Sequence, residues 1–299
     1  MPSPEMREFI EQFEQRRAAR PDTPPALAEL RAGFLPAGRK YEVPDDVRVS
    51  AVSAAGVPAY WLDAPDTSPD RVLVFVHGGG FTLGSLDSHG ELAARLGRAA
   101  GARVVFPEYR LTPEHPYPAP VEDIRALWRW LREDQGVAAS SVVLVGDSSG
   151  GNLIAALLLE LRDAGAELPA AAVLLSPALD MSGSGVSMTE RDGQDAIFTP
   201  GMLRGIFATY LDGADPRIPS ASPLFGDLAG LPPLLIQAGT AELLLSDAEG
   251  FAAAAREAGV EVALTLGEGL PHVYVIMRDT PEAAAATEEI AAFVRKRLG

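Results

Sequence analysis

The sequence predicts an α/β fold with a mostly parallel eight-stranded sheet, flanked by helices and carrying a helical cap. Eight segments of strand length recur along the chain, and helical patterns separate most of them. This alternation is typical of parallel sheets with right-handed crossovers. The later strand segments are almost entirely apolar, which indicates burial on both faces of the sheet.

The elements follow in order from the N-terminus. Met6, Phe9, Ile10 and Phe13 lie three or four positions apart and predict an amphipathic helix near residues 4–19. The expected strands are VRVSAV, VPAYWL, RVLVFV, RVVFPEY, VVLVGD, AAVLLS, PLLIQAG and EVALTL, of which the first two predict an antiparallel hairpin. The expected helices between and after them cover residues 88–101, 119–134, 149–164, 247–258 and 282–297.

One stretch breaks this alternation. Residues 181–232 are rich in Gly, Ser, Asp and Pro around a single helical piece, PGMLRGIFATYL. We interpret the stretch as an insertion over the sheet, joined there by the N-terminal helix. The expected organisation is a cap formed by residues 1–45 and 181–225, on a catalytic core formed by residues 46–180 and 226–299.

Composition excludes several classes of function. The chain has 299 residues, of which 47% are hydrophobic, and its net charge is −16. This charge disfavours nucleic acid and anionic membranes as partners. The absence of cysteine excludes disulfides and thiolate metal sites. The N-terminus lacks an apolar signal stretch, and the apolar runs are shorter than the ~20 residues that span a bilayer, so we expect a cytoplasmic protein without stable membrane insertion.

A serine on a sharp turn is the first catalytic candidate. Gly146-Asp147-Ser148-Ser149-Gly150 fits the G-x-S-x-G pattern between the strand VVLVGD and a long helix. This context is typical of a nucleophile elbow, in which the turn exposes the serine hydroxyl and the helix N-terminus points at it. An ordinary Gly/Ser turn is the alternative, which the strand and the helix on either side disfavour.

The run His77-Gly78-Gly79-Gly80 follows another apolar strand. Attack of a serine on a carbonyl group creates an oxyanion, and backbone N–H groups stabilise it best where no side chain blocks approach. We expect Gly79 and Gly80 to donate to the oxyanion together with the N–H of Ser149, and Gly78 is a further candidate. The side chain of His77 is expected to tether the loop through hydrogen bonds.

Only four histidines are present, and His272 is the expected general base. It follows the last predicted strand and lies C-terminal to Ser148, as the order serine, acid, histidine requires. His77 belongs to the glycine loop. His89 is expected to act at a helix terminus, and His115 is expected to be a hydrogen-bonded loop residue among prolines.

The acid of the triad has three candidates. Glu242 lies within a few residues of the strand PLLIQAG, on the side of the loop that faces the catalytic edge of a parallel sheet. Asp247 is expected at the N-terminus of the next helix, where the helix dipole would stabilise it. Asp180 opens the insertion, one strand earlier. We rank Glu242 first, Asp247 second and Asp180 third.

Several of these segments together resemble a known family. HGGGF, PEYRLTPEHPYPAPVED, GDSSGGN, SPLFGDLAGLPPLLIQAGTAELLLSDA and PHVYVIM are similar to the bacterial esterase branch of the hormone-sensitive-lipase family of α/β-hydrolases. The resemblance implies that fold with a helical cap, hydrolysis of esters with short acyl chains, and no cofactor. It places the nucleophile on Ser148 and the base on His272. The family's usual D-P-L-x-D-E segment aligns its Asp with Glu242, with Glu in place of Asp and without the proline.

The sequence thus predicts a serine carboxylesterase that hydrolyses short-chain carboxylic esters through an acyl-enzyme intermediate. Amide or lactone hydrolysis would use the same triad, and a non-catalytic small-molecule receptor on this scaffold is the alternative outside catalysis. The expected partner is a small-molecule ester substrate, without metal, cofactor or nucleic acid, and a homodimer is left open. Candidates to line the substrate cavity, or to pack the cap on the core, are Phe9, Phe13, Phe34, Phe198, Met202, Ile206, Phe207 and Tyr210.

Overall fold

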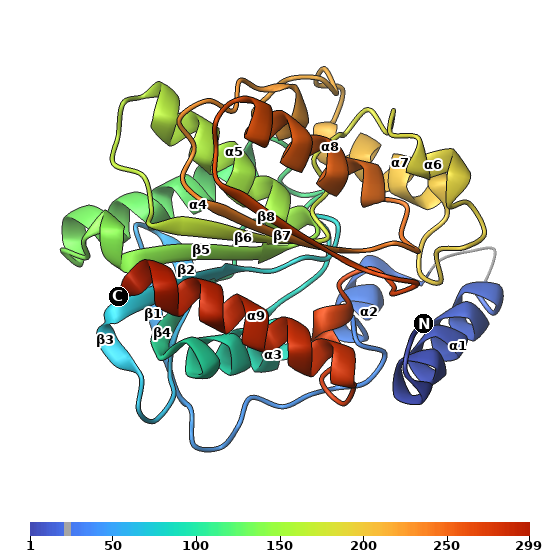
Figure 1. Cartoon of the computed structure of the whole chain (residues 1–299), viewed down its shortest axis with the longest axis horizontal. Helices are drawn as coiled ribbons and strands as arrows, with labels where there is room; N and C mark the ends of the chain where they lie inside the picture. Colours follow the sequence, from blue (N-terminus) through green and yellow to red (C-terminus); the bar gives the residue numbers. More distant parts are fainter. Residues whose placement is uncertain (21–24) are drawn as a thin grey trace.

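Eight strands form a single sheet in the order β1-β2-β4-β3-β5-β6-β7-β8 (Figure 1). The computed structural model describes residues 1–20 and 25–299, so residues 21–24 of the expected N-terminal cap segment lie outside the described residues. The strands are β1 (Arg48–Ala54), β2 (Val57–Asp63), β3 (Ser68–Val76), β4 (Ala102–Pro107), β5 (Val142–Asp147), β6 (Ala171–Leu175), β7 (Leu234–Gly239) and β8 (Val262–Gly267).

Pairing directions confirm the predicted sheet. β1 and β2 form the expected antiparallel hairpin, β2 also pairs antiparallel with β4, and the remaining neighbours are parallel. The register sets Val76 beside Gly146 and Asp147 beside Leu175. The carboxyl ends of β3, β5 and β6 therefore meet at one edge of the sheet, which is where parallel sheets bind ligands.

Helices cover both faces of the sheet (Figure 1). One face carries α3 (Leu86–Ala100) and α9 (Pro281–Leu298), and the other carries α4 (Ala119–Arg129), α5 (Ser149–Asp163) and α8 (Leu245–Glu257). Alternate residues of β5 face the two layers: Val142 and Leu144 join one core cluster, while Val143 and Val145 join the other. The apolar strands predicted from the sequence are thus buried on both sides, as expected.

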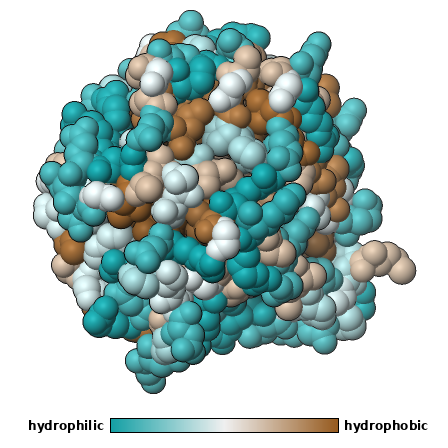
Figure 2. Space-filling view, turned by 60° about the vertical axis from the view of Figure 1, so that its left-hand side comes forward, coloured by the Kyte–Doolittle hydropathy of each residue, from teal (hydrophilic) through white to brown (hydrophobic). Residues whose placement is uncertain are grey.

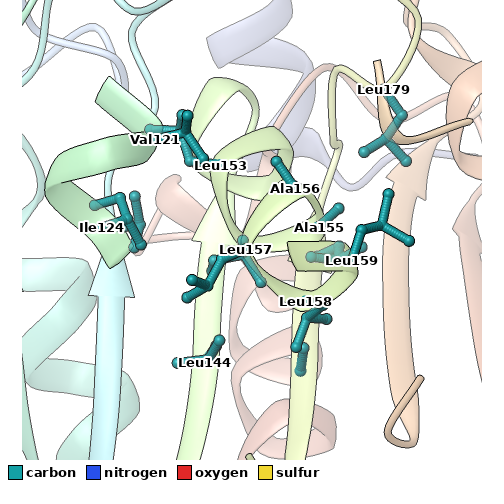
Figure 3. Close-up of a cluster of buried hydrophobic side chains, with 14 of the residues drawn as sticks. Val121, Ile124, Leu144, Leu153, Ala155, Ala156, Leu157, Leu158, Leu159 and Leu179 are labelled. Carbon is teal, nitrogen blue, oxygen red and sulfur yellow. The ribbon is translucent and has the colours of Figure 1, made fainter. Parts of the chain in front are cut away.

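Helix α5 is buried along most of its length. Its apolar side chains pack between α4 and β5, where Leu153 and Leu157 approach Val121 and Leu144 (Figure 3). Since a helix that is hydrophobic on all sides requires cover on all sides, this helix is fixed in the core. Its first turn, which follows Ser148, inherits that rigidity.

Four helices gather at one end of the sheet (Figure 1). They are α1 (Pro4–Ala18) and α2 (Leu27–Ala32) from the N-terminal segment, and α6 (Ser187–Glu190) and α7 (Pro200–Leu211) from the insertion (residues 181–225). Helix α7 covers the predicted piece PGMLRGIFATYL, and α1 agrees with the predicted helix to within one residue. The short helices α2 and α6 were not expected.

Proline and a polar cap define where α1 and α7 begin. Ser3 accepts a hydrogen bond from the Met6 N–H at 3.1 Å, and Thr199 accepts one from the Met202 N–H at 3.3 Å. Each helix then starts with proline. Such caps satisfy N–H groups that have no partner inside the helix, and proline fits the first position because it lacks that N–H.

Polar residues dominate the surface seen in Figure 2, where hydrophobic residues form smaller groups between them. This agrees with the acidic composition of the chain. Across residues 1–20 and 25–299, no helix is both long enough and apolar enough to cross a membrane.

Candidate active site

A sharp turn between β5 and α5 presents Ser148 at the carboxyl edge of the sheet. Its backbone has φ 51° and ψ −117°, outside the regions that residues with side chains ordinarily occupy. A Cβ on Gly146 would lie 2.6 Å from the backbone of Gly150, and a Cβ on Gly150 would lie 2.0 Å from the carbonyl oxygen of Val76. Both flanking positions therefore require glycine. Strained backbone of this kind is common at functional sites, which makes Ser148 a candidate for function.

The glycine loop after β3 has the conformation that glycine alone adopts readily. Gly79 has φ 119° and Gly80 has φ 62°. The N–H of Gly78 donates to Asp147 Oδ1 at 2.9 Å. By contrast, no hydrogen bond within the described part of the chain uses the N–H of Gly79 or Gly80. Together with the N–H of Ser149 at the start of α5, these two groups can donate to an anionic oxygen.

Glu242 and His272 form a buried pair. Glu242 follows β7, His272 follows β8, and His272 Nδ1 donates to Glu242 Oε2 at 2.7 Å. Burial alone would lower the pKa of His272, but the hydrogen bond and the charge of Glu242 outweigh it and raise that pKa above its ordinary value. The bond also fixes the tautomer, so that Nε2 of a neutral ring is free to accept a proton.

The loop that carries His272 is held to β6. The next residue, Val273, has φ 51°, which is unusual for a β-branched side chain. Its N–H donates to the hydroxyl of Ser176 at 2.9 Å. On the other side, the ring of Phe198 meets the imidazole edge-on, with 5.1 Å between ring centroids. These contacts orient His272 from both the core and the insertion.

A cavity of about 680 Å³ brings these groups together. Ser148 and His272 both line it, next to Gly79 and Gly80, although no hydrogen bond joins the serine hydroxyl to the histidine ring. Catalytic hydrogen bonds are often long in unliganded proteins. The opposite walls come from the two segments beyond the sheet. Of the eight apolar candidates, five line the cavity: Phe13, Phe34, Phe198, Met202 and Ile206.

The remaining apolar candidates pack elsewhere. Phe9 is buried in one core cluster, and Phe207 and Tyr210 belong to the other. Tyr210 stacks on Phe81, with 3.6 Å between ring centroids. For these three residues the alternative expectation of packing between cap and core is correct.

Comparison with known proteins identifies the fold family. A family model described as the alpha/beta hydrolase fold matches residues 73–276. A solved esterase structure from the bacterial hormone-sensitive lipase family superposes with a TM-score of 0.92 at 39% identity, covering 100% of both chains. The chain belongs to the hormone-sensitive-lipase family of α/β-hydrolases.

Two further proteins show a similar likeness. An acetyl-hydrolase of Streptomyces hygroscopicus is 43% identical over 249 residues, which are 83% of this chain and 83% of that protein. The structure of EstE5 soaked with p-nitrophenyl butyrate superposes with a TM-score of 0.92 at 35% identity, covering 99% of each chain. The resemblance read from the sequence motifs is thereby confirmed.

In this hormone-sensitive-lipase homologue, the other two acid candidates contact other groups. Asp247 is buried in the first turn of α8, and its Oδ2 accepts from the N–H groups of Leu179 and Asp180 at 2.6 and 2.9 Å. Asp247 therefore links the first turn of α8 to the segment that follows β6, in addition to its expected place at a helix N-terminus. Burial raises the pKa of Asp247 to about 7. Asp180 accepts from the N–H groups of Ser182 and Ser184 and closes a local turn.

His89 lies in the first turn of α3, as expected, with its Nδ1 2.8 Å from the hydroxyl of Ser88 in the helix cap. Its side chain is buried, and its Nε2 lies 3.4 Å from Asp147 Oδ2. His77 packs against it, as expected for a structural residue, with Nδ1 at 2.8 Å from the oxygen of Gly78. Burial and the neighbouring His89 lower the pKa of His77 to about 3, so His77 stays neutral. His115 is exposed in its loop, and its N–H donates to Leu111.

One buried acidic residue beside the pair was not predicted from the sequence. Asp195, in the insertion, accepts a hydrogen bond from the N–H of Leu243, the residue after Glu242. The two lie 48 positions apart, so no local pattern marks the contact. Among the described residues, no group of three or more histidine or acidic side chains could hold a metal ion.

Proposed function

We propose that the protein is a serine carboxylesterase that hydrolyses short-chain carboxylic esters. The observation that carries the proposal is the 2.7 Å bond between the buried Glu242 and His272, whose ring lines the same cavity as the strained Ser148. A hydrogen-bonded acid and imidazole beside a serine on a helix N-terminus is the arrangement that activates a serine hydroxyl. The names of the relatives, acetyl-hydrolase and esterase, support the same reaction.

The first half of the reaction forms the acyl-enzyme. Ser148 Oγ attacks the ester carbonyl carbon while His272 Nε2 takes its proton, and Glu242 stabilises the imidazolium that results. The negative charge that develops on the carbonyl oxygen is stabilised by the N–H groups of Gly79, Gly80 and Ser149. The Gly78 N–H is engaged by Asp147, which favours Gly79 and Gly80 within the glycine loop.

The second half releases the acid. His272 returns its proton to the leaving alcohol, which departs and leaves the acyl group on Ser148. A water molecule then loses a proton to His272 and attacks the acyl carbon, and collapse of the second tetrahedral intermediate restores the serine hydroxyl. Every proton in the cycle therefore passes through Nε2 of one imidazole.

The segments beyond the sheet form the proposed cap. Residues 1–45 and 181–225 supply most of the apolar wall opposite Ser148, including Phe34 and Met202. A largely apolar cavity with few polar groups suits the acyl or alkyl part of an ester. The cytoplasmic location and the homodimer stay predictions of the sequence.

The proposal is tested by Ser148→Ala, measured against p-nitrophenyl esters. We expect the variant to fold, as judged by near-UV circular dichroism, and to lose activity by about 10⁶-fold, the loss measured for nucleophile removal in a serine protease. Ser140→Ala, at an exposed serine just before β5, is the matched control and should keep wild-type activity. A folded Ser148→Ala protein with wild-type turnover would refute the mechanism.

A further inference from the structure

The residue after Glu242 is held on both sides of its backbone by the insertion. The N–H of Leu243 donates to Asp195 Oδ2 at 2.9 Å, and its carbonyl oxygen accepts from the hydroxyl of Ser187 at 2.6 Å. The same hydroxyl also accepts from the N–H of Ser246 at 3.0 Å. The loop that carries Glu242 is thus fixed by two side chains that belong to the segment over the cavity, and not to the sheet.

Asp195 is the charged member of this arrangement. It is 1% exposed, and its Oδ1 accepts from the N–H groups of Ile197 and Phe198 at 2.8 and 2.9 Å. A buried carboxylate keeps its charge at low cost only where donors surround it. Its two oxygens therefore bind two backbone segments at once: one leads to Phe198 and the other leads to Glu242.

Each of the two segments carries a side chain that contacts His272. The ring of Phe198 lines the cavity and meets the imidazole edge-on at 5.1 Å, while Glu242 bonds Nδ1 at 2.7 Å. Helix α1 joins the arrangement from outside, because Arg17 donates to the backbone oxygen of Asp195. A change at Asp195 should accordingly alter the position of His272 through both Phe198 and Glu242.

We propose that Asp195 is a positioning residue for the Glu242–His272 pair, through which the insertion sets the orientation and charge environment of the catalytic histidine. The inference rests on the proposed function. It assigns to the segment over the cavity a part in the chemical step, besides that of lining the substrate site.

The negative charge of Asp195 distinguishes a positioning role from a purely structural role in holding the loop. The carboxylates whose charges raise the pKa of His272 are Glu242 from the β7–α8 loop, Asp195 from the insertion and Asp147 from the elbow. The Arg17 guanidinium donates to the backbone oxygen of Asp195 and not to its carboxylate. Activity requires the neutral ring, so loss of the Asp195 charge should lower the pH at which kcat/KM falls on the acidic side.

The test compares Asp195→Asn with Ser187→Ala, using p-nitrophenyl acetate across the pH range. Both variants loosen the hold on Leu243, but only the first removes a charge. For Asp195→Asn we expect kcat to fall by about tenfold or more with little change in KM, because misplaced acid–base groups lose part of their 10²–10⁴-fold contribution. We also expect its acidic limb to move to lower pH. The limb of Ser187→Ala should stay at the wild-type position.

Each outcome either supports the positioning role of Asp195 or overturns it. Wild-type kcat and an unmoved limb in Asp195→Asn would overturn the proposal, and so would a lower kcat with an unmoved limb, since that indicates support alone. Asp195→Ser serves as a second uncharged variant if the amide does not fold, and failure of both to fold would make Asp195 a stability residue and also overturn the assignment. Absence of esterase activity in the wild-type protein would instead refute the proposed function.

Discussion

Glutamate takes the place of aspartate as the proposed acid of the triad, and its environment explains how the longer side chain is used. Glu242 is fully buried and bonds His272 from a loop whose next residue is held on its N–H and its carbonyl oxygen. The extra methylene gives the side chain another rotatable bond, so the fixed backbone matters more for placing the carboxylate. The longer side chain thus explains why the hydrogen bonds of Asp195 and Ser187 to Leu243 matter in this protein.

Replacement of this acid is expected to be severe. Glu242→Gln keeps a hydrogen-bonding group but removes the charge that stabilises the imidazolium. The comparable change in a serine protease, from aspartate to asparagine, costs about 10⁴ in kcat. The pKa of His272 should also fall, which moves the acidic limb of kcat/KM to lower pH. Steady-state kinetics across pH would measure both effects.

A matched control exists on α9. Glu289 bonds Gln237 and Thr265 at 2.6 Å each, outside the cavity, so Glu289→Gln makes the same chemical change away from His272. Its kcat should remain at the wild-type level. A kcat of Glu242→Gln within about threefold of wild type would count against Glu242 as the acid, since a catalytic charge contributes far more.

Asp247 is expected to govern stability instead of rate. Its carboxyl has a pKa near 3.9 in an unfolded chain and about 7 in the fold. Between these values the folded protein binds more protons than the unfolded chain, so ionisation of Asp247 costs stability as pH rises. In Asp247→Asn, an amide oxygen can still accept from the N–H groups of Leu179 and Asp180.

The measurement is the Tm of wild type and Asp247→Asn as a function of pH. The difference should shift in favour of the variant as pH rises from about 4 to about 7, because only the wild type ionises there. A difference that is independent of pH would contradict the assignment, and so would a loss of kcat comparable to that of Glu242→Gln.

Among the helices and strands, periodic sequence patterns predicted the elements well, whereas the tertiary contacts between them could not be predicted. The apolar strands and the long helices lie where periodicity placed them, and α7 begins and ends at the predicted residues Pro200 and Leu211. The helices α2 and α6 have six and four residues, too few to show a helical period. Contacts across the sequence, such as that of Asp195 with Leu243, leave no local signal.

Helix α7 should control which esters enter. Ile206 lies against the glycine loop, since a Cβ on Gly80 would come within 3.0 Å of its Cγ2. In Ile206→Trp the added ring should fill the cavity there and lower kcat/KM for p-nitrophenyl octanoate relative to acetate by roughly tenfold, the scale of discrimination by pocket size.

The control for this change lies two residues away, on the opposite side of the helix. Arg204 is exposed and outside the cavity lining, so Arg204→Trp adds the same ring without entering the cavity. The ratio of the two rates should then be that of the wild type. An unchanged ratio in Ile206→Trp would mean that α7 does not bound the substrate site.

At the scale of the whole molecule, the parallel sheet explains how residues distant in sequence meet. Ser148 follows β5, Glu242 follows β7 and His272 follows β8, so three strand ends bring their loops to one edge. Sequence motifs could predict the elbow and the glycine loop because each is local and demands glycine. The choice between Glu242 and Asp247 depended on loop geometry, which motifs do not encode.

In the proposed mechanism, Ser148 carries the acyl group during turnover. Rapid quenching of the protein with p-nitrophenyl acetate, followed by mass spectrometry of the intact chain and its peptides, tests this most directly. We expect one acetyl group per chain, located on Ser148, with p-nitrophenol released in a matching burst, and no acetylation in Ser148→Ala. Acetylation of a different residue that turns over at the steady-state rate, or full turnover in Ser148→Ala, would contradict the account.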